Sequence, residues 1–468
     1  MPALERGEQQ PAAESRGRHR QWRNTVAGAA VLLMLGGVAG CGTTAGGGGK
    51  GPSASGTPSP SPTRPPSTEA AAVLKEFVPK VDEDYHTSAT GNWVAGEVYA
   101  TGVPFAVVGY QAATGRKLWT LPLSGEICES SRDASRGLVA VVHRATKDSE
   151  ALCTRMSLID LSTGKQVWEK PVPGSVSKGF GLNVNVSESI AAAGWPDGSV
   201  AYQTTTAGRQ LWQNAPAGCS GPEHHGTNDV YGISFCQDRR FRVERRSPDT
   251  GRVEWTYTLP RGPRAAYIVS ASPLVVATSH GEDYDVDGPD TLTSFTSQGK
   301  VQATIDLGKR KYETGCDDDG TCDAIVVAHD TIYLATHAKN FRTQNALTAF
   351  DVRSGARKWS SPAPDAGGNF VPVRAESGEP MAYQEPTPLK GAKLFRFDPA
   401  TGRQSLVLRM PPVDMSGDND SRDLVRADGR DPALYSHGRL YLHFSGIYWP
   451  EETGKSLMSA IYAPKPNA

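Results

Sequence analysis

The sequence predicts an all-β protein, a β-propeller of eight four-stranded blades, with seven blades as the alternative. Three observations lead to this prediction. A turn motif recurs seven times, apolar runs of strand length flank each copy, and no long segment with helical periodicity follows residue 40. The motif glycines lie 43 to 56 residues apart, a spacing typical of propeller blades. They are Gly115, Gly164, Gly208, Gly251, Gly299, Gly355 and Gly402.

Residues 156–172 illustrate one repeat. Met156 to Leu161 alternate between the two faces of a strand, and residues 162–165 then form a tight turn. Gly164 supplies the positive φ that such a turn requires, and Lys165 begins the returning strand. A further apolar run precedes each pair, so that each repeat has enough strands for a blade.

Five of the seven copies end in tryptophan. We interpret these residues as packing between neighbouring blades, because a ring of equivalent positions suits the architecture better than it suits one ligand site. A set of ligand-stacking rings is the alternative. Ala303 and Leu406 replace the tryptophan in the other two copies. The five are Trp119, Trp168, Trp212, Trp255 and Trp359.

The two ends of the repeat region predict how the ring closes. Residues 438–446 and 456–464 read as strands, but the chain then ends without an outer strand for that sheet. Residues 71–79 form an isolated apolar run before the first repeat. We expect this N-terminal strand to complete the C-terminal sheet, because closure removes exposed sheet edges.

The N-terminal region reads as an export signal. Arginines precede an apolar stretch, residues 25–38, that is short for a membrane span, and small residues lead to Cys41. This arrangement resembles a bacterial lipobox, so we expect a lipoprotein signal peptide over 1–40 and lipidation of Cys41, with palmitate as one acyl chain. An ordinary signal peptide with an incidental cysteine is the alternative.

Residues 41–70 read as a disordered tether, because they are nearly all Gly, Ser, Thr and Pro. The propeller is then expected over 71–468, on the extracytoplasmic face of the cell membrane. The chain has a formal charge of −1 and no basic stripe, so nucleic acid is not expected as a partner. The amino-acid usage is typical of a high-GC actinobacterium.

Six cysteines remain after Cys41, an even number that favours disulfides in an exported protein. Neighbours in the sequence lie within one blade or at a blade junction, so we predict local pairs. A metal cluster is disfavoured, because no C-x-x-C pair occurs. The predicted pairs are Cys128–Cys153, Cys219–Cys236 and Cys316–Cys322.

The x-T-G-(K/R)-x-x-W copies resemble PQQ-like propeller repeats, which form the blades of quinoprotein dehydrogenases and of many non-enzymatic secreted propellers. The resemblance covers roughly residues 72–464. In the dehydrogenases it would imply a quinone (PQQ) in the central channel, calcium, a carboxylate base, a Trp platform and often a vicinal disulfide. This sequence has no Cys-Cys dipeptide, and its residues cannot be matched to that site. We therefore predict no catalytic residues and no PQQ.

One acidic segment is a calcium candidate. Asp283, Asp285 and Asp287 match the start of a D-x-D-x-D-G loop, whose oxygen ligands suit calcium. The twelfth position is Ser294 rather than Glu, so the match is incomplete. A solvated acidic loop is the alternative to structural calcium.

These observations favour a lipid-anchored, non-catalytic propeller that binds another protein or an envelope component. The plan is similar to that of the barrel-assembly lipoproteins of Gram-negative outer membranes, although a shared architecture does not transfer a partner. A quinoprotein oxidoreductase and a ligand- or polysaccharide-sensing module are the alternatives.

Overall fold

A computed structural model describes the part of the chain that the sequence assigns to the propeller, with gaps. Strands are the regular elements of the described residues, and no helix among them is long and apolar enough to cross a membrane. The expected signal peptide, Cys41 and most of the tether lie outside the described residues. The described ranges are 67–77, 90–174, 181–215, 218–225, 229–281, 288–316, 322–338, 343–365, 367–387, 390–412, 432–444 and 457–466.

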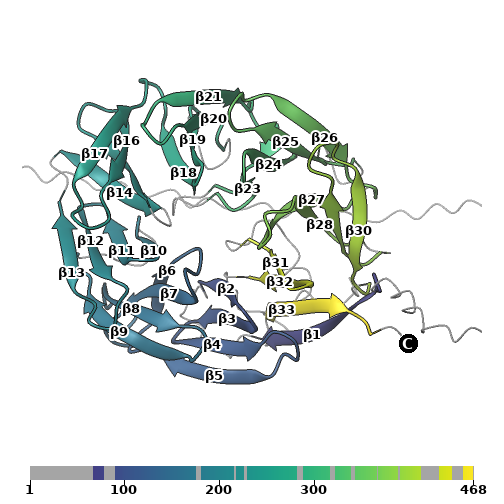
Figure 1. Ribbon diagram of the computed structural model, residues 1–468, viewed down its shortest axis with the longest axis horizontal. Helices are drawn as coiled ribbons and strands as arrows, with labels where there is room; N and C mark the ends of the chain where they lie inside the picture. Colours follow the sequence, from purple (N-terminus) through teal and green to yellow (C-terminus); the bar gives the residue numbers. More distant parts are fainter. Residues whose placement is uncertain are drawn as a thin grey trace, which may run out of the picture. The chain divides into compact units, whose positions relative to one another are not determined.

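The strands follow one another in antiparallel groups of four that are arranged as a ring (Figure 1). The first three sheets use consecutive strands, each ordered from the ring centre outward. They comprise β2 (Asn92–Ala95), β3 (Val98–Val103), β4 (Ala106–Gln111) and β5 (Lys117–Pro122); β6 (Ile127–Ser130), β7 (Leu138–Arg144), β8 (Cys153–Asp160) and β9 (Lys165–Pro171); and β10 (Asn183–Val186), β11 (Ile190–Trp195), β12 (Gly198–Gln203) and β13 (Gln210–Asn214).

The next three sheets repeat this order, and the third of them has one additional short strand. They comprise β14 (Cys219–His225), β15 (Val230–Cys236), β16 (Phe241–Arg246) and β17 (Val253–Thr258); β18 (Ala265–Ala271), β19 (Leu274–Ser279), β20 (Thr291–Phe295) and β21 (Val301–Asp306); and β22 (Tyr312–Glu313), β23 (Ile325–Ala328), β24 (Thr331–Thr336), β25 (Ala346–Asp351) and β26 (Arg357–Pro362). Both β22 and β23 pair with β24.

The remaining strands form one eight-stranded sheet made of two antiparallel groups. A short parallel pairing of β27 with β31 joins the groups, at Arg374↔Leu434 and Ala375↔Tyr435. The described strand order agrees with eight four-stranded units, but two of them share a hydrogen-bonded sheet, so the blade number stays a prediction. The strands are β27 (Phe370–Ala375), β28 (Met381–Gln384), β29 (Lys393–Phe397), β30 (Gln404–Arg409), β31 (Leu434–Ser436), β32 (Arg439–His443), β33 (Leu457–Pro464) and β1 (Ala70–Phe77).

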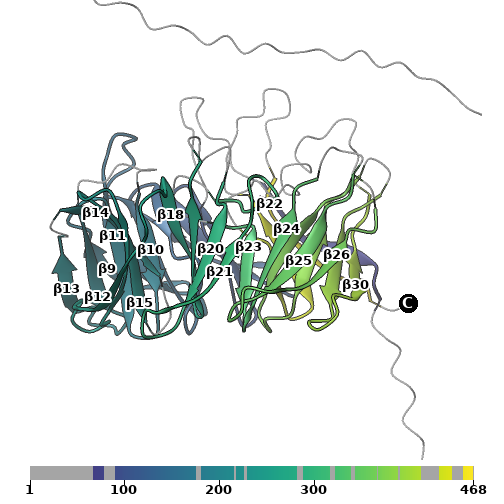
Figure 2. The ribbon, with the colours of Figure 1, turned by 90° about the horizontal axis from the view of Figure 1, so that it is seen from above.

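The two ends of the described chain close the ring together. Strand β1 pairs antiparallel with β33, from Ala70↔Pro464 to Phe77↔Leu457, and Figure 1 shows the purple and yellow strands side by side. The turned view in Figure 2 shows the strands crossing the thickness of the ring. The predicted completion of the C-terminal sheet by the N-terminal strand is confirmed.

Apolar side chains gather between neighbouring units rather than in one central core. The described residues form eight hydrophobic clusters, and each joins strands of two adjacent units. The cluster that contains Leu74, Tyr99 and Tyr441 joins the first unit to the strands that close the ring. Stability therefore depends on contacts between neighbours, as in other repeat folds.

The recurring tryptophans lie at these interfaces. All seven motif glycines have positive φ, between 53° and 76°. In five units, a Cβ at the motif glycine would collide with the indole of the preceding unit, so only glycine allows the ring to pack there. The pairs are Trp119–Gly164, Trp168–Gly208, Trp212–Gly251, Trp255–Gly299 and Trp359–Gly402.

Four of the indoles also donate a hydrogen bond to the backbone of the next unit. The acceptors lie near that unit's motif turn, and this geometry is what the blade-packing interpretation requires. The bonds are Trp168–Gln203 (3.1 Å), Trp212–Pro248 (2.8 Å), Trp255–Ser297 (3.0 Å) and Trp359–Pro399 (2.9 Å).

A hydroxyl bridges the interface where Ala303 replaces the tryptophan. The Ser294 hydroxyl donates to the Val352 carbonyl of the next unit, at 2.6 Å. A Cβ on Gly355 would lie no closer than 3.1 Å to its neighbours, so this junction is less crowded than those with tryptophan. Where the tryptophan indole is missing, a polar contact thus connects the two units.

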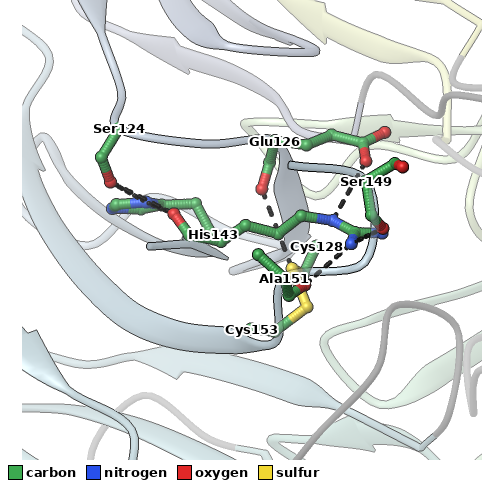
Figure 3. Close-up of a disulfide and its surroundings, with 8 residues drawn as sticks. Ser124, Glu126, Cys128, His143, Ser149, Ala151 and Cys153 are labelled. Carbon is green, nitrogen blue, oxygen red and sulfur yellow. Dashed lines mark hydrogen bonds and ion pairs between the residues drawn. A yellow bond between two sulfur atoms is a disulfide. The ribbon is translucent and has the colours of Figure 1, made fainter. Parts of the chain in front are cut away.

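The described residues contain three disulfides, and they are the pairs that the sequence predicts. Cys128–Cys153 connects β6 to β8 across β7, with Cα atoms 6.1 Å apart (Figure 3). Cys219 and Cys236 are direct register partners of β14 and β15. Cys316 and Cys322 form an isolated β-bridge before β23.

Candidate binding site

A cavity of about 600 Å³ lies at the centre of the ring. Its lining includes residues from β2, β6, β10, β18, β23, β27 and β31, which are inner strands in Figure 1. Many lining residues are at the C-terminal ends of these strands or in the turns that follow, such as Ser272, His329 and Ser377. We call this space the axial cavity.

One connection reaches across the ring centre. Residues 131–137 separate β6 from β7, whereas only two residues separate β18 from β19. The Arg132 side chain donates to the Val269 carbonyl at 3.4 Å and lies 3.5 Å from the Asp323 carboxylate. Both partners belong to units across the ring from Arg132. Asp133 pairs with Arg374 at 2.8 Å. These contacts fix the connection against the opposite side of the channel.

The charged lining of the axial cavity is unbalanced. Four carboxylates line it against two guanidinium groups, an excess of two negative charges. Both guanidinium groups are in the ion pairs just described. Because each arginine already has a carboxylate partner, the lining is less suited to anions than its two arginines suggest. The carboxylates belong to Glu129, Asp133, Glu376 and Glu379.

A serine, a histidine and a glutamate meet at the rim of the axial cavity, but not as a catalytic triad. The Ser436 hydroxyl lies 2.7 Å from His437 Nδ1 and bonds to Glu376, and the Glu376 carboxylate is 3.4 Å from the same Nδ1. A triad requires the carboxylate and the nucleophile on different ring nitrogens. Ser436 is also only 5% exposed, so its hydroxyl serves the local turn rather than acyl transfer.

A second histidine cluster is buried within the second sheet, beside the disulfide Cys128–Cys153 (Figure 3). His143 is fully buried, with Nε2 2.9 Å from the Ser157 hydroxyl and Nδ1 3.0 Å from the Arg144 carbonyl. Burial lowers the pKa of His143 below its usual value, although the Glu169 carboxylate 3.6 Å away opposes the shift. Ser157 is also fully buried, so this cluster is structural.

The Arg144 side chain adds a charged contact to the same region. Its Nε lies 3.3 Å from the Glu126 carboxylate, and it donates to the Ala151 carbonyl at 2.7 Å. Both charged side chains are largely buried, at 12% and 5% exposure. The ion pair and the disulfide Cys128–Cys153 thus hold the β7–β8 connection to the start of β6.

The described residues do not fit a quinone with its calcium ion. No group of three His, Cys, Asp or Glu side chains that could hold a metal occurs among them. Trp93 borders the axial cavity but is 1% exposed and donates to the Ser131 carbonyl at 2.7 Å, so it offers no free face for a quinone. Arg132 and Arg374, the cations that could bind quinone carboxylates, are in ion pairs with aspartates.

The predicted calcium ligands Asp283, Asp285 and Asp287 lie outside the described residues. Asp290, which follows them, is described and has local partners. Its carboxylate is 2.8 Å from His280 Nδ1 and accepts the Thr291 hydroxyl at 2.9 Å. These bonds, above all those from His280, lower the pKa of Asp290 despite partial burial.

None of the five motif tryptophans lines the axial cavity. The residues that do line it belong to no recurring motif, which is why the sequence analysis missed them. One signal was available, since residues 131–137 make an unusually long connection and place Arg132 beside Asp133. Without the ring topology, their partners Asp323 and Arg374 could not be named.

The sequence matches a protein-family model described as "Outer membrane protein assembly factor BamB" over residues 105–361 and 239–430, together more than half of the chain. The chain belongs to this family. The resemblance to PQQ-like propeller repeats is therefore confirmed, and the BamB family match extends over most of the strands described above.

Solved structures similar to the chain include a BamB protein and an alcohol dehydrogenase. BamB from Moraxella catarrhalis has 12% identity and a TM-score of 0.43, with 83% of this chain and all of that one covered. Quinohemoprotein alcohol dehydrogenase from Comamonas testosteroni has 13% identity and a TM-score of 0.44, covering 86% and 78%. No curated protein matches the sequence.

Proposed function

We propose that this protein is a lipid-anchored, extracytoplasmic propeller that binds a protein or envelope component and has no catalytic activity. The axial cavity is the observation that supports this proposal. It is open to a ligand group. At its rim, however, Ser436 and Glu376 both lie against Nδ1 of His437, and this arrangement is unsuited to nucleophilic catalysis. The BamB family described above is consistent with a binding role in the envelope.

We propose anchoring through Cys41, as the lipobox-like sequence indicates. Two acyl chains hold a protein on a membrane stably, whereas one gives only marginal binding. Mass spectrometry of the membrane fraction should find diacylated Cys41 at the N-terminus. The Cys41→Ala variant should leave that fraction, and a variant that stays membrane-bound would contradict the anchor.

We propose that no quinone cofactor is bound, because the described cavity residues do not fit one. Calorimetry of the purified chain with the quinone and calcium tests this point. We expect no heat of quinone binding. Tight, calcium-dependent uptake by folded protein would instead support the oxidoreductase alternative.

The partner proposal is tested by capture from the native envelope. Full-length protein with a C-terminal affinity tag would be crosslinked in cells of the source organism and purified, with the Glu376→Lys variant as a comparison. We expect one or a few envelope proteins to co-purify with the wild type and to be depleted with the variant, because the substitution reverses the charge of an exposed carboxylate in the cavity lining. Recovery of the same proteins with the wild type and the variant would show that the partner does not bind at the cavity.

The cavity volume also favours a second candidate, a sensor of a small ligand or a glycan. About 600 Å³ lies within the range of small-molecule sites, and serine and asparagine side chains contribute to its lining. Binding to a glycan array that is lost on substitution of cavity residues would favour the sensor over the protein-binding role.

A further inference from the structure

The axial cavity combines excess negative charge with a buried hydrogen-bond acceptor for which the described part of the chain supplies no donor. We propose that it binds an organic cation, the guanidinium or ammonium group of a basic side chain on a partner peptide. The proposal rests on the proposed binding role, because it names the chemistry by which the partner is recognised. Three features of the cavity support it.

The first feature is the distribution of charge. The guanidinium groups of Arg132 and Arg374 face Asp323 and Asp133, so neither is free to attract an anion. Glu376 is 62% exposed at the rim, and its described contacts are with Ser436 and His437. With Glu129 further along the lining, the cavity has more carboxylates than cations, which favours a positively charged ligand.

The second feature is the side chain of Asn92, which is 4% exposed and lines the cavity. Its Nδ2 donates to the Pro432 carbonyl at 3.2 Å, but its Oδ1 has no hydrogen-bond partner among the described residues. A buried amide oxygen without a donor is unfavourable, and the great majority of such groups are satisfied in folded proteins. A ligand with N–H groups would satisfy Oδ1, whereas a carboxylate or phosphate ligand would not.

The third feature distinguishes an organic cation from a metal ion. The carboxylates come from separate strands, since Glu129 is in β6 and Glu376 follows β27. The described residues contain no group of three acidic, histidine or cysteine side chains close enough to coordinate a metal. Dispersed acceptors match a group with several N–H donors, such as a guanidinium on a flexible stem.

Calorimetry on the purified full-length protein tests the proposal with defined probes. The probes are the pentapeptide amide Gly-Gly-Arg-Gly-Gly, its citrulline analogue, which has the same shape without the charge, and spermidine. We expect the arginine peptide to bind and the citrulline peptide to bind at least tenfold more weakly. Equal binding of both peptides would overturn the proposal. Binding of spermidine alone would overturn the peptide source and assign the site to free polyamines.

Two carboxamide variants locate the binding in the cavity. Glu376→Gln should weaken the arginine peptide about tenfold, because a charged hydrogen-bond acceptor becomes neutral. Glu188→Gln is the matched control, since Glu188 is 48% exposed and pairs with Arg136 outside the cavity lining. It should leave the affinity unchanged. Equal effects of the two substitutions, or no effect of Glu376→Gln, would contradict a cavity site.

The outcome is separable from that of the proposed function. If the arginine peptide binds but envelope capture yields no partner, the cation site stands and the proposed protein-binding role fails. If capture succeeds and is insensitive to Glu376→Gln, the protein-binding role stands and the cation site fails. Circular dichroism of each variant establishes that the chain is folded in both experiments.

Discussion

The contact between Trp359 and Gly402 predicts a large and specific cost for adding one methyl group. Gly402 has a φ of 71°, and a Cβ there would lie 2.7 Å from the Trp359 ring. The ring is 7% exposed, stacks on Phe397 with centroids 5.7 Å apart, and donates to the Pro399 carbonyl. Gly402→Ala therefore forces both a strained backbone and a displaced indole.

Gly308 supplies a matched control for the backbone contribution. Its φ is 67°, and a Cβ there would meet no atom within 4 Å. Gly308→Ala should cost about 1–2 kcal/mol, the penalty for alanine in the left-handed region. Gly402→Ala adds a shift of the indole by about 0.8 Å to restore normal carbon–carbon contact. Such overpacking costs about 1–3 kcal/mol, for a total of roughly 2–5 kcal/mol.

Urea titration followed by circular dichroism and tryptophan fluorescence measures both costs, provided that the two signals coincide. We expect Gly402→Ala to lower the free energy of unfolding more than Gly308→Ala does. In a Trp359→Ala background, Gly402→Ala should cost only the backbone contribution. Equal costs for the two glycine variants would refute the packing argument. So would a cost of Gly402→Ala that is as large in the Trp359→Ala background as in the wild type.

Three further predictions concern stability. Replacing Cys128 and Cys153 together by alanine should lower the free energy of unfolding by about 3.5 kcal/mol, from the loop-entropy model for their 25-residue separation, as urea titration would show. Asp323→Asn should cost more than Asp133→Asn in the same titration, because Asp323 is 8% exposed and Asp133 is 67% exposed; the reverse order would contradict the cross-channel contacts. Because burial lowers the pKa of His143, this histidine takes up a proton at a higher pH in the unfolded chain than in the folded one. The contribution of neutral His143 to stability should therefore be full above about pH 6.5 and fall on acidification. His143→Gln should flatten that part of the pH profile, and an unchanged slope would show that other groups cause it.

The fold could be predicted from the sequence because its determinants are local and repeated. Each motif turn needs a glycine at positive φ, and each such glycine lies against the preceding unit. The pairing of β1 with β33 followed from a strand without a partner at each end of the chain. The sequence also contains Thr453-Gly454-Lys455, 52 residues after Gly402, a further partial copy of the motif that would have supported the eighth unit directly.

The axial cavity could not be predicted, because its residues are brought together only by ring closure. Arg374 and Asp133 are 241 residues apart, and neither lies in a recurring pattern. Asn92 begins the short inner strand β2 and gives no local sign that its Oδ1 would be buried without a donor among the described residues. The repeated motif predicts the propeller fold. The axial cavity is lined by inner-strand residues that differ from one repeat to the next.

Site-specific photocrosslinking in the native envelope tests the central claim, that the protein binds a partner at the axial cavity. A photoreactive amino acid would replace Ser377, in the turn after β27 at the cavity, and separately Asp197, in the β11–β12 turn outside its lining. We predict a discrete protein adduct from position 377 and none from position 197. Adducts from position 197 alone, or none from either position in folded, membrane-bound protein, would contradict the proposed role.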